Sequence, residues 1–192
     1  MSLRNEILAR LAEGKQITAK EMLHLGNRAA IDQVLSRLAR SGKLIRVSRG
    51  LYVAPVQGRF GSRPPSASKV LESLAEQRGE TVVRHGASAA NALGLTTQIP
   101  VREVYLTSGP DRELKLGAQI VELRHAPAWQ LVLPGTAGGD MVRALAWLGR
   151  GKASEEVLKG HLPPNEREAL LAARALLPTW MAQEISSLAR QG

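Results

Sequence analysis

The sequence of 192 residues predicts an α+β protein with two domains, and three observations carry that prediction. Within residues 1–57, apolar side chains recur first at helical spacing and then in two short β-prone runs. Residues 58–65 are rich in glycine, proline and serine, which predicts a linker. In residues 66–192 strand patterns come before a helical C-terminal end, which is typical of a mixed α+β domain.

Charge is concentrated in the first third of the chain. The formal net charge is +9, and residues 1–61 hold 11 basic and four acidic side chains, a net charge of +7. The other 131 residues hold 15 basic and 13 acidic side chains, a net charge of +2. This asymmetry predicts that the first domain meets a polyanion, although solubility alone would also explain it.

Composition excludes several classes of protein. Hydrophobic residues make up 44%, which indicates a packed core, and the absence of cysteine excludes disulfides, thiolate zinc sites and cysteine nucleophiles. One Phe, two Tyr and three Trp are too few for a base-stacking platform of many rings. No apolar run approaches the roughly 20 residues that span a bilayer, and the N-terminus lacks the apolar stretch of a signal peptide. We therefore expect a cytoplasmic protein without membrane contact.

Two helices are expected at the start of the first domain. Leucine and isoleucine side chains at helical spacing predict a helix over 3–13. Thr18 and Glu21 have the spacing of a capping box, which predicts a second helix over 19–25. Gly26 then suits the position after the last helical residue.

A third helix, over 28–41 with Asn27 as its N-cap, would complete a helix-turn-helix. Its apolar stripe predicts a buried face, and its opposite face suits a DNA duplex. Glutamine pairs with adenine, arginine with guanine or phosphate, and small residues allow close approach in the major groove. An ordinary solvated helix face is the alternative. The outward residues are Ala29, Gln33, Ser36, Arg37 and Arg40.

A β-hairpin is predicted within 43–55, turning at Ser48-Arg49-Gly50. Three helices and a hairpin in about 55 residues are the layout of a winged helix-turn-helix. Winged helices also serve as protein-interaction modules, but the net charge of +7 favours DNA. The side chains expected at DNA are Thr18, Lys20, Asn27, Arg28, Gln33, Ser36, Arg37, Arg40, Arg46, Ser48 and Arg49.

The second domain shows strand and helix signals in alternation. A helix is expected from Ser66 and a tightly packed helix of small residues over 85–94, with strands at 80–84, 101–107 and 119–124. Helical patterns fill the chain from Thr136 onward, including one around Val157 and Leu158.

Four basic side chains fall at strand ends in this domain: Arg84, His85, Arg124 and His125. If the two strands are neighbours, these residues form a small basic patch that contributes to the function of the second domain or to DNA contact. Capping and solvation of strand ends is the alternative interpretation.

No pattern indicates catalysis. The four histidines, at positions 24, 85, 125 and 161, lack metal-ligand spacing. The segment GASAA at 86–90 lacks the second glycine of a nucleophile elbow, and residues 134–140 form neither a P-loop nor a dinucleotide fingerprint. We therefore expect no enzyme, no metal and no cofactor.

Several segments together carry a family resemblance. They are LSRLARSGKLIR at 35–46, RGLY at 49–52, RHGASAAN at 84–91, LGLTTQIP at 93–100, LTSG at 106–109 and LRHA at 123–126. This combination resembles the AbiEi family, the antitoxins of type IV toxin–antitoxin systems in abortive infection. The resemblance covers most of residues 3–126.

The resemblance implies an antitoxin with two activities. Its winged helix would bind inverted repeats in double-stranded promoter DNA and repress its own operon, and its second domain would counteract a nucleotidyltransferase-like toxin, commonly without a stable complex. The residues leave two alternatives open: a winged-helix regulator whose second domain senses a small molecule, and a protein-interaction module or helper enzyme acting on nucleic acid. A monomer at each repeat, binding cooperatively, and a dimer are both compatible with the sequence.

Overall fold

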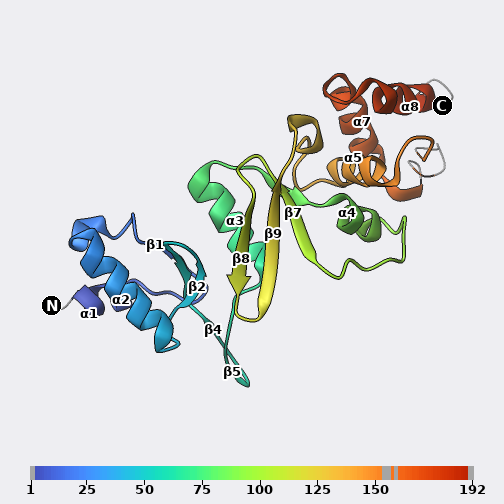
Figure 1. Ribbon diagram of the computed structural model, residues 1–192. Helices are drawn as coiled ribbons and strands as arrows, with labels where there is room; N and C mark the ends of the chain where they lie inside the picture. Colours follow the sequence, from blue (N-terminus) through green and yellow to red (C-terminus); the bar gives the residue numbers. More distant parts are fainter. Residues whose placement is uncertain (1–2, 153–156, 158–159, 190–192) are drawn as a thin grey trace. The chain divides into compact units, whose positions relative to one another are not determined.

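The computed structural model describes residues 3–152, 157 and 160–189, and its helices and strands confirm the α+β class (Figure 1). Contacts group the chain into two compact units, Met1–Gly79 with Glu113–Val121 and Glu80–Arg112 with Glu122–Gly192. The division into domains 1–57 and 66–192 with a linker at 58–65 stays a prediction. No helix of the described ranges is long and apolar enough to cross a bilayer.

The first unit begins with a small helical part closed by an antiparallel sheet of order β1-β3-β2. The predicted hairpin is confirmed, and Gly50 in its turn has the positive φ of +74° that favours glycine. The elements are α1 (Leu3–Ala9), β1 (Gln16–Thr18), the 3₁₀ helix η1 (Leu23–Leu25), α2 (Arg28–Arg40), β2 (Ile45–Ser48) and β3 (Leu51–Val53).

The helix predicted over 19–25 is wrong, although its capping box forms. The backbone N–H of Thr18 donates to Glu21 Oε2 at 3.0 Å, and the N–H of Glu21 donates to Thr18 Oγ1 at 3.2 Å. Thr18, however, pairs with Leu51 at the end of β1, and this pairing holds the chain extended. Only a turn and η1 fit before Gly26, whose φ of 166° is extended and not left-handed. The helix predicted over 3–13 is also shorter than expected, because α1 ends at Ala9.

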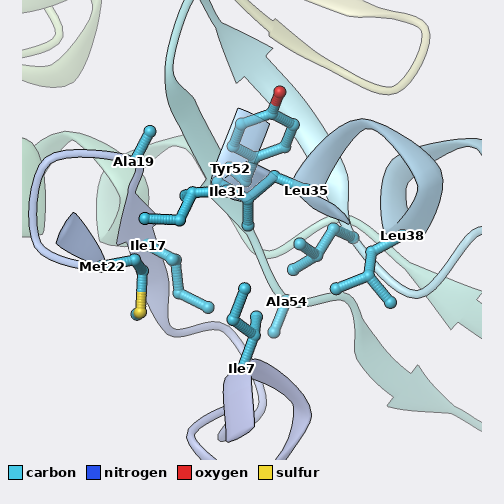
Figure 2. Close-up of a cluster of buried hydrophobic side chains, with 10 residues drawn as sticks. Ile7, Ile17, Ala19, Met22, Ile31, Leu35, Leu38, Tyr52 and Ala54 are labelled. Atoms are coloured by element: carbon cyan, nitrogen blue, oxygen red, sulfur yellow. The ribbon is translucent and has the colours of Figure 1, made fainter. Parts of the chain in front are cut away.

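A single apolar cluster joins these elements (Figure 2). Ile7 of α1, Ile17 of β1 and Leu35 of α2 are each 0% exposed. Burial of such side chains contributes about 1.5–3 kcal/mol each relative to exposure. The cluster fixes which face of α2 points inward, and so also which face points to solvent.

Most of residues 58–65 belong to a β-hairpin, which the sequence pattern did not indicate. Strands β4 (Val56–Gly58) and β5 (Gly61–Arg63) form an antiparallel hairpin with Arg59 and Phe60 at its tip. A Cβ on Gly58 would lie 3.3 Å from the carbonyl oxygen of Gly61, so the strands approach closely where both carry glycine. Helix α3 (Ala67–Arg78) follows, as expected from Ser66, and buries Val70, Leu71 and Leu74.

The second unit contains most of a four-stranded sheet of order β6-β7-β9-β8 and a group of helices. Strand β8 was not expected, whereas β6, β7 and β9 confirm the predicted strands. Leu158 lies outside the described residues. The elements are β6 (Val82–Arg84), α4 (Gly86–Ala92), β7 (Glu103–Thr107), β8 (Arg112–Leu116), β9 (Gln119–His125), the 3₁₀ helix η2 (Ala128–Gln130), α5 (Ala137–Leu148), α7 (Pro164–Ala172), the 3₁₀ helix η3 (Ala173–Leu176) and α8 (Thr179–Ala189).

Candidate nucleic-acid interface

Helix α2 presents a polar face opposite its buried stripe. Ile31, Leu35 and Leu38 are at most 2% exposed, whereas Gln33 and Arg37 are exposed on the other side. Ala29 and Arg40 are exposed as well, and Ser36 is half-buried. At 100° per residue this face is centred directly opposite the core. The apolar cluster therefore positions the very side chains that the sequence analysis selected.

Three of these polar side chains have no partner among the residues that the structure describes. In the described part of the chain, no hydrogen bond or ion pair engages the side chains of Gln33, Arg37 or Arg40. Long side chains of this kind lose rotamer entropy when they become fixed, so leaving them unpaired keeps them available to a ligand. A bidentate glutamine or arginine can then pair with a base edge or a phosphate.

The N-terminal end of α2 lies beside the turn of the β2–β3 hairpin. Asn27 caps the helix by accepting a hydrogen bond from the N–H of Ala30 at 2.8 Å. A Cβ on Gly50 would lie 3.7 Å from Nη2 of Arg28, so the guanidinium of Arg28 reaches the hairpin turn. Arg28 also forms an exposed ion pair with Asp32 at 2.9 Å, worth a few tenths of a kcal/mol.

The β2–β3 hairpin keeps its basic residues outside. Its register shifts between Arg46 and Ser48, and this irregularity leaves Val47 buried while Arg46 remains exposed. Arg49, in the turn, is exposed as well. The hairpin therefore adds two cations to the surface that begins on α2.

The remaining predicted residues divide into two groups. Lys20 is exposed and Ser48 is half-buried. Thr18 and Asn27 use their side-chain oxygens to hold the turn after β1 and the start of α2. These two side chains therefore stabilise the local backbone. From the sequence alone, such capping residues cannot be told apart from side chains that contact DNA.

The residues expected to form a basic patch in the second unit each have a partner. Arg84 forms an ion pair with Asp140 at 2.9 Å, and Arg124 one with Glu122 at 2.7 Å. The ring of His125 lies 2.9 Å, at Nδ1, from the carbonyl oxygen of Gly109. Strand β7 lies between β6 and β9, so the two strands are not neighbours. The carboxylates of Asp140 and Glu122 compensate the positive charges of Arg84 and Arg124.

His85 caps helix α4, and the positive charge of Arg124 acts on its imidazole. Its Nδ1 accepts a hydrogen bond from the N–H of Ala87 at 3.4 Å. Burial, together with the positive charge of Arg124, lowers the pKa of the imidazole below its ordinary value. A neutral ring suits this position, because protonation of Nδ1 would remove the capping acceptor.

Lowering the pH should therefore destabilise the second unit through His85. The folded chain binds a proton at this ring less readily than the unfolded chain does. The stabilisation that the neutral ring contributes is therefore fully present above the unfolded pKa of about 6.5, and it is lost as the pH falls through the lower pKa of the folded chain. In urea denaturation from pH 7.5 to pH 5, the free energy of unfolding should fall more steeply for the wild type than for His85→Asn, which keeps a capping oxygen but does not titrate. Equal slopes would show that His85 does not control this pH dependence.

A polar network that no sequence pattern indicated is centred on Arg143. This side chain is 1% exposed and donates to the carbonyl oxygens of Gln130 and Val132 and to Asp140 Oδ1. Asp140 thus bridges the buried Arg143 and the exposed Arg84. The spacing of Asp140 and Arg143, three residues apart on one helix, is the only sequence signal of this network.

Tyr105, which no sequence pattern indicated as a site residue, lies opposite Arg84 in the β6–β7 pair. Its hydroxyl donates to Glu103 Oε1 at 3.1 Å. Burial, with the neighbouring charge and hydrogen bond of Glu103, raises the pKa of Tyr105 to about 12. The phenol therefore stays protonated at neutral pH and acts as a hydrogen-bond donor.

Among the residues that the structure describes, no group of three or more His, Asp or Glu could hold a metal ion.

Fold and surface together define an α+β protein whose first unit carries a basic helix and hairpin. The chain belongs to the DUF6088 family, a family of unknown function, whose model matches residues 4–162. The match includes α2, both hairpins of the first unit and all four strands of the larger sheet. No curated protein matches the chain.

Proposed function

We propose that this protein is a sequence-specific DNA-binding repressor with a winged helix-turn-helix at its N-terminus. Helix α2 is the recognition helix and the β2–β3 hairpin is the wing. The observation that carries the proposal is the exposed face of α2, where Gln33, Arg37 and Arg40 have no internal partner among the described residues and lie opposite a fully buried stripe.

Dimensions and charge support this assignment. Helix α2 has 13 residues and is about 20 Å long, and the major groove, about 12 Å wide, admits one helix. The order of helix, sheet strand, turn, helix and hairpin is compatible with a winged helix in which a 3₁₀ turn replaces the second helix. Residues 1–61 carry a net charge of +7, which supplies the attraction to phosphate.

The proposal extends to antitoxin action in the cytoplasm. Its support is the resemblance to AbiEi antitoxins, which implies repression of a shared operon through inverted repeats and neutralisation of a nucleotidyltransferase-like toxin. In this proposal the second unit counteracts the toxin, with Arg84, His85, Arg124 and His125 as its candidate surface, and has no enzymatic activity of its own.

Selection from a pool of random 30-bp duplexes tests the DNA-binding half of the proposal with the full-length protein. Binding of the selected duplex should exceed that of a scrambled duplex, and the logarithm of the association constant should fall linearly with the logarithm of the salt concentration. Equal binding of both duplexes at every salt concentration would refute a sequence-specific repressor.

Co-expression tests the antitoxin half. The protein should restore growth to cells that express the nucleotidyltransferase-like toxin encoded beside its gene. Arg84→Gln combined with Arg124→Gln should reduce this rescue while leaving duplex binding unchanged. Full rescue by the double variant would remove the patch from the mechanism, and no rescue by the wild type would refute the antitoxin.

Two single substitutions should separate base recognition from phosphate contact. Gln33→Ala should relax the preference for the selected duplex by about tenfold, because a bidentate base contact is worth roughly 1–3 kcal/mol of discrimination. Arg49→Ala should weaken all duplexes alike and reduce the magnitude of the salt slope by about one. Gln77→Ala, an exposed glutamine on α3, is the matched control and should change neither quantity.

A further inference from the structure

The hairpin of β4 and β5 ends in a fully exposed aromatic ring. Phe60 is the only phenylalanine of the chain, and it is 100% exposed in the turn between β4 and β5. Figure 1 shows this hairpin projecting as a narrow two-stranded ribbon. Burying such a ring would contribute about 1.5–3 kcal/mol, so leaving it in water forgoes a large stabilisation. A two-stranded hairpin is at best marginally stable alone, and the exposed ring at its tip adds no stability to it. The position of the ring therefore indicates contact with a partner.

The hairpin is firmly anchored at its base. Ala54, which precedes it, is 4% exposed and exchanges backbone hydrogen bonds of 2.9 and 3.1 Å with Lys15 and Gly14. Pro65, which follows it, is buried. Along the hairpin, the side chains of Gln57 and Ser62 hydrogen-bond across the strands at 2.9 Å. The bonds at the base and across the strands therefore fix the position of the turn, with Arg59 and Phe60, relative to the rest of the first unit.

The charge of the hairpin indicates the chemistry of its partner. Residues 56–63 contain two arginines, Arg59 and Arg63, and no acidic residue. Both arginines are exposed. An apolar ring flanked by cations suits a nucleic acid, in which stacked bases lie between two rows of phosphates.

The pairing of β2 with β3 places the start of the β4–β5 hairpin relative to helix α2. The C-terminal end of α2 leads within a few residues to Ile45, and Ile45 pairs with Val53, three residues before β4 begins. The turn of the β2–β3 hairpin lies at the other end of the same strand pair, beside Arg28 at the start of α2. The turn of the β2–β3 hairpin and the start of the β4–β5 hairpin thus lie toward opposite ends of helix α2, within one unit of the structure.

We infer that the β4–β5 hairpin is a second DNA-binding wing, in which Phe60 inserts between base pairs in the minor groove while Arg59 and Arg63 contact the flanking phosphates. This inference rests on the proposed binding of duplex DNA by α2. From Ala54 to Phe60 the chain can reach about 20 Å at about 3.3 Å per residue. The neighbouring minor groove lies about half a helical turn, or 17 Å, from the centre of the major groove. Insertion of an apolar wedge unstacks a base step and bends the duplex.

The test measures affinity and bending on the same DNA. The full-length protein is titrated onto the selected 30-bp duplex, which carries a donor and an acceptor dye at its two ends. Wild type should raise the energy transfer between the ends. Phe60→Ala should abolish this rise and weaken binding about tenfold, without changing the salt slope, because the ring carries no charge. Arg59→Ala should instead reduce the magnitude of the slope by about one.

Ile99→Ala is the matched control, since Ile99 is also a largely exposed apolar side chain, at 81%, and lies in the other unit. It should leave bending and affinity unchanged. The midpoint of thermal unfolding should be the same for Phe60→Ala and wild type, because the ring makes no buried contact.

Three results would overturn the inference. Wild-type bending and affinity in Phe60→Ala would exclude insertion while leaving the recognition helix intact. Loss of a dimer in Phe60→Ala without DNA, seen by sedimentation, would make the ring a contact between two copies of the chain. Failure of the wild type to bind any duplex would remove the proposed function together with the second wing.

Discussion

Reversing the charges of Arg37 and Arg40 together should weaken binding to the selected duplex by at least about a hundredfold at low salt. Both side chains lie on the exposed face of α2, where they would contact a base edge or a phosphate. Each lost contact of this kind costs roughly 1–3 kcal/mol, and each new carboxylate would face phosphate. Gel-shift titration of Arg37→Glu with Arg40→Glu measures the effect. The fold should be retained because neither side chain has an internal partner among the described residues.

A control of equal charge keeps this result from reflecting net charge alone. Lys69→Glu with Arg78→Glu places the same change on α3, where both side chains are exposed and Arg78 lies in the last turn, as Arg40 does in α2. This variant should lose affinity by only a small factor, through long-range attraction that salt screens. Equal losses in the two double variants would show that α2 is not the contact surface.

Gly139→Ala should be the most destabilising of the single substitutions considered, lowering the free energy of unfolding by about 3 kcal/mol or more. An added Cβ would overlap the carbonyl oxygen of Leu133 and would lie 2.8 Å from both the Val132 oxygen and Nη2 of Arg143. Two of these atoms are backbone, and the third belongs to an arginine that is already fixed by hydrogen bonds. Alanine's better helix propensity, worth about 1 kcal/mol, offsets only part of the strain.

The adjacent glycine provides the comparison for this prediction. At Gly138, an added Cβ would meet Glu166 at 3.1 Å and Leu133 at 3.4 Å, distances that a small shift relieves. Gly138→Ala should therefore cost far less in urea denaturation than Gly139→Ala, although both glycines are buried in the first turn of α5. Similar losses for the two variants would contradict the steric explanation.

Local signals predicted helix α2 and the β2–β3 hairpin. The cap at Asn27, the apolar stripe of α2 and the glycine of the hairpin turn each act within a few residues, so the sequence contains all that is needed to recognise them. The exposed face of α2 followed directly from the position of the stripe. For this reason the candidate interface could be located before the structure was known.

Pairing between distant residues was what the sequence could not reveal. Strand β1 exists because Ile17 pairs with Tyr52, and this pairing replaced the helix expected over 19–25. Arg84 and Asp140 are 56 positions apart, so no local pattern indicates their ion pair. The hairpin at 56–63 was hidden for another reason: its glycines and Pro64 and Pro65 are the residues that also compose linkers.

The grouping of Glu113–Val121 with Met1–Gly79 has a consequence for how the protein is made. During translation, the first unit lacks these nine residues until the ribosome has added more than thirty residues beyond Gly79. A Cβ on Gly117 would lie 3.0 Å from Cγ of Pro64, so this late segment contacts the residue that follows β5. Because contacts between residues far apart in sequence form late, a nascent or prematurely terminated chain would emerge with its first unit incomplete. Synthesis of the first unit is thereby tied to synthesis of the second.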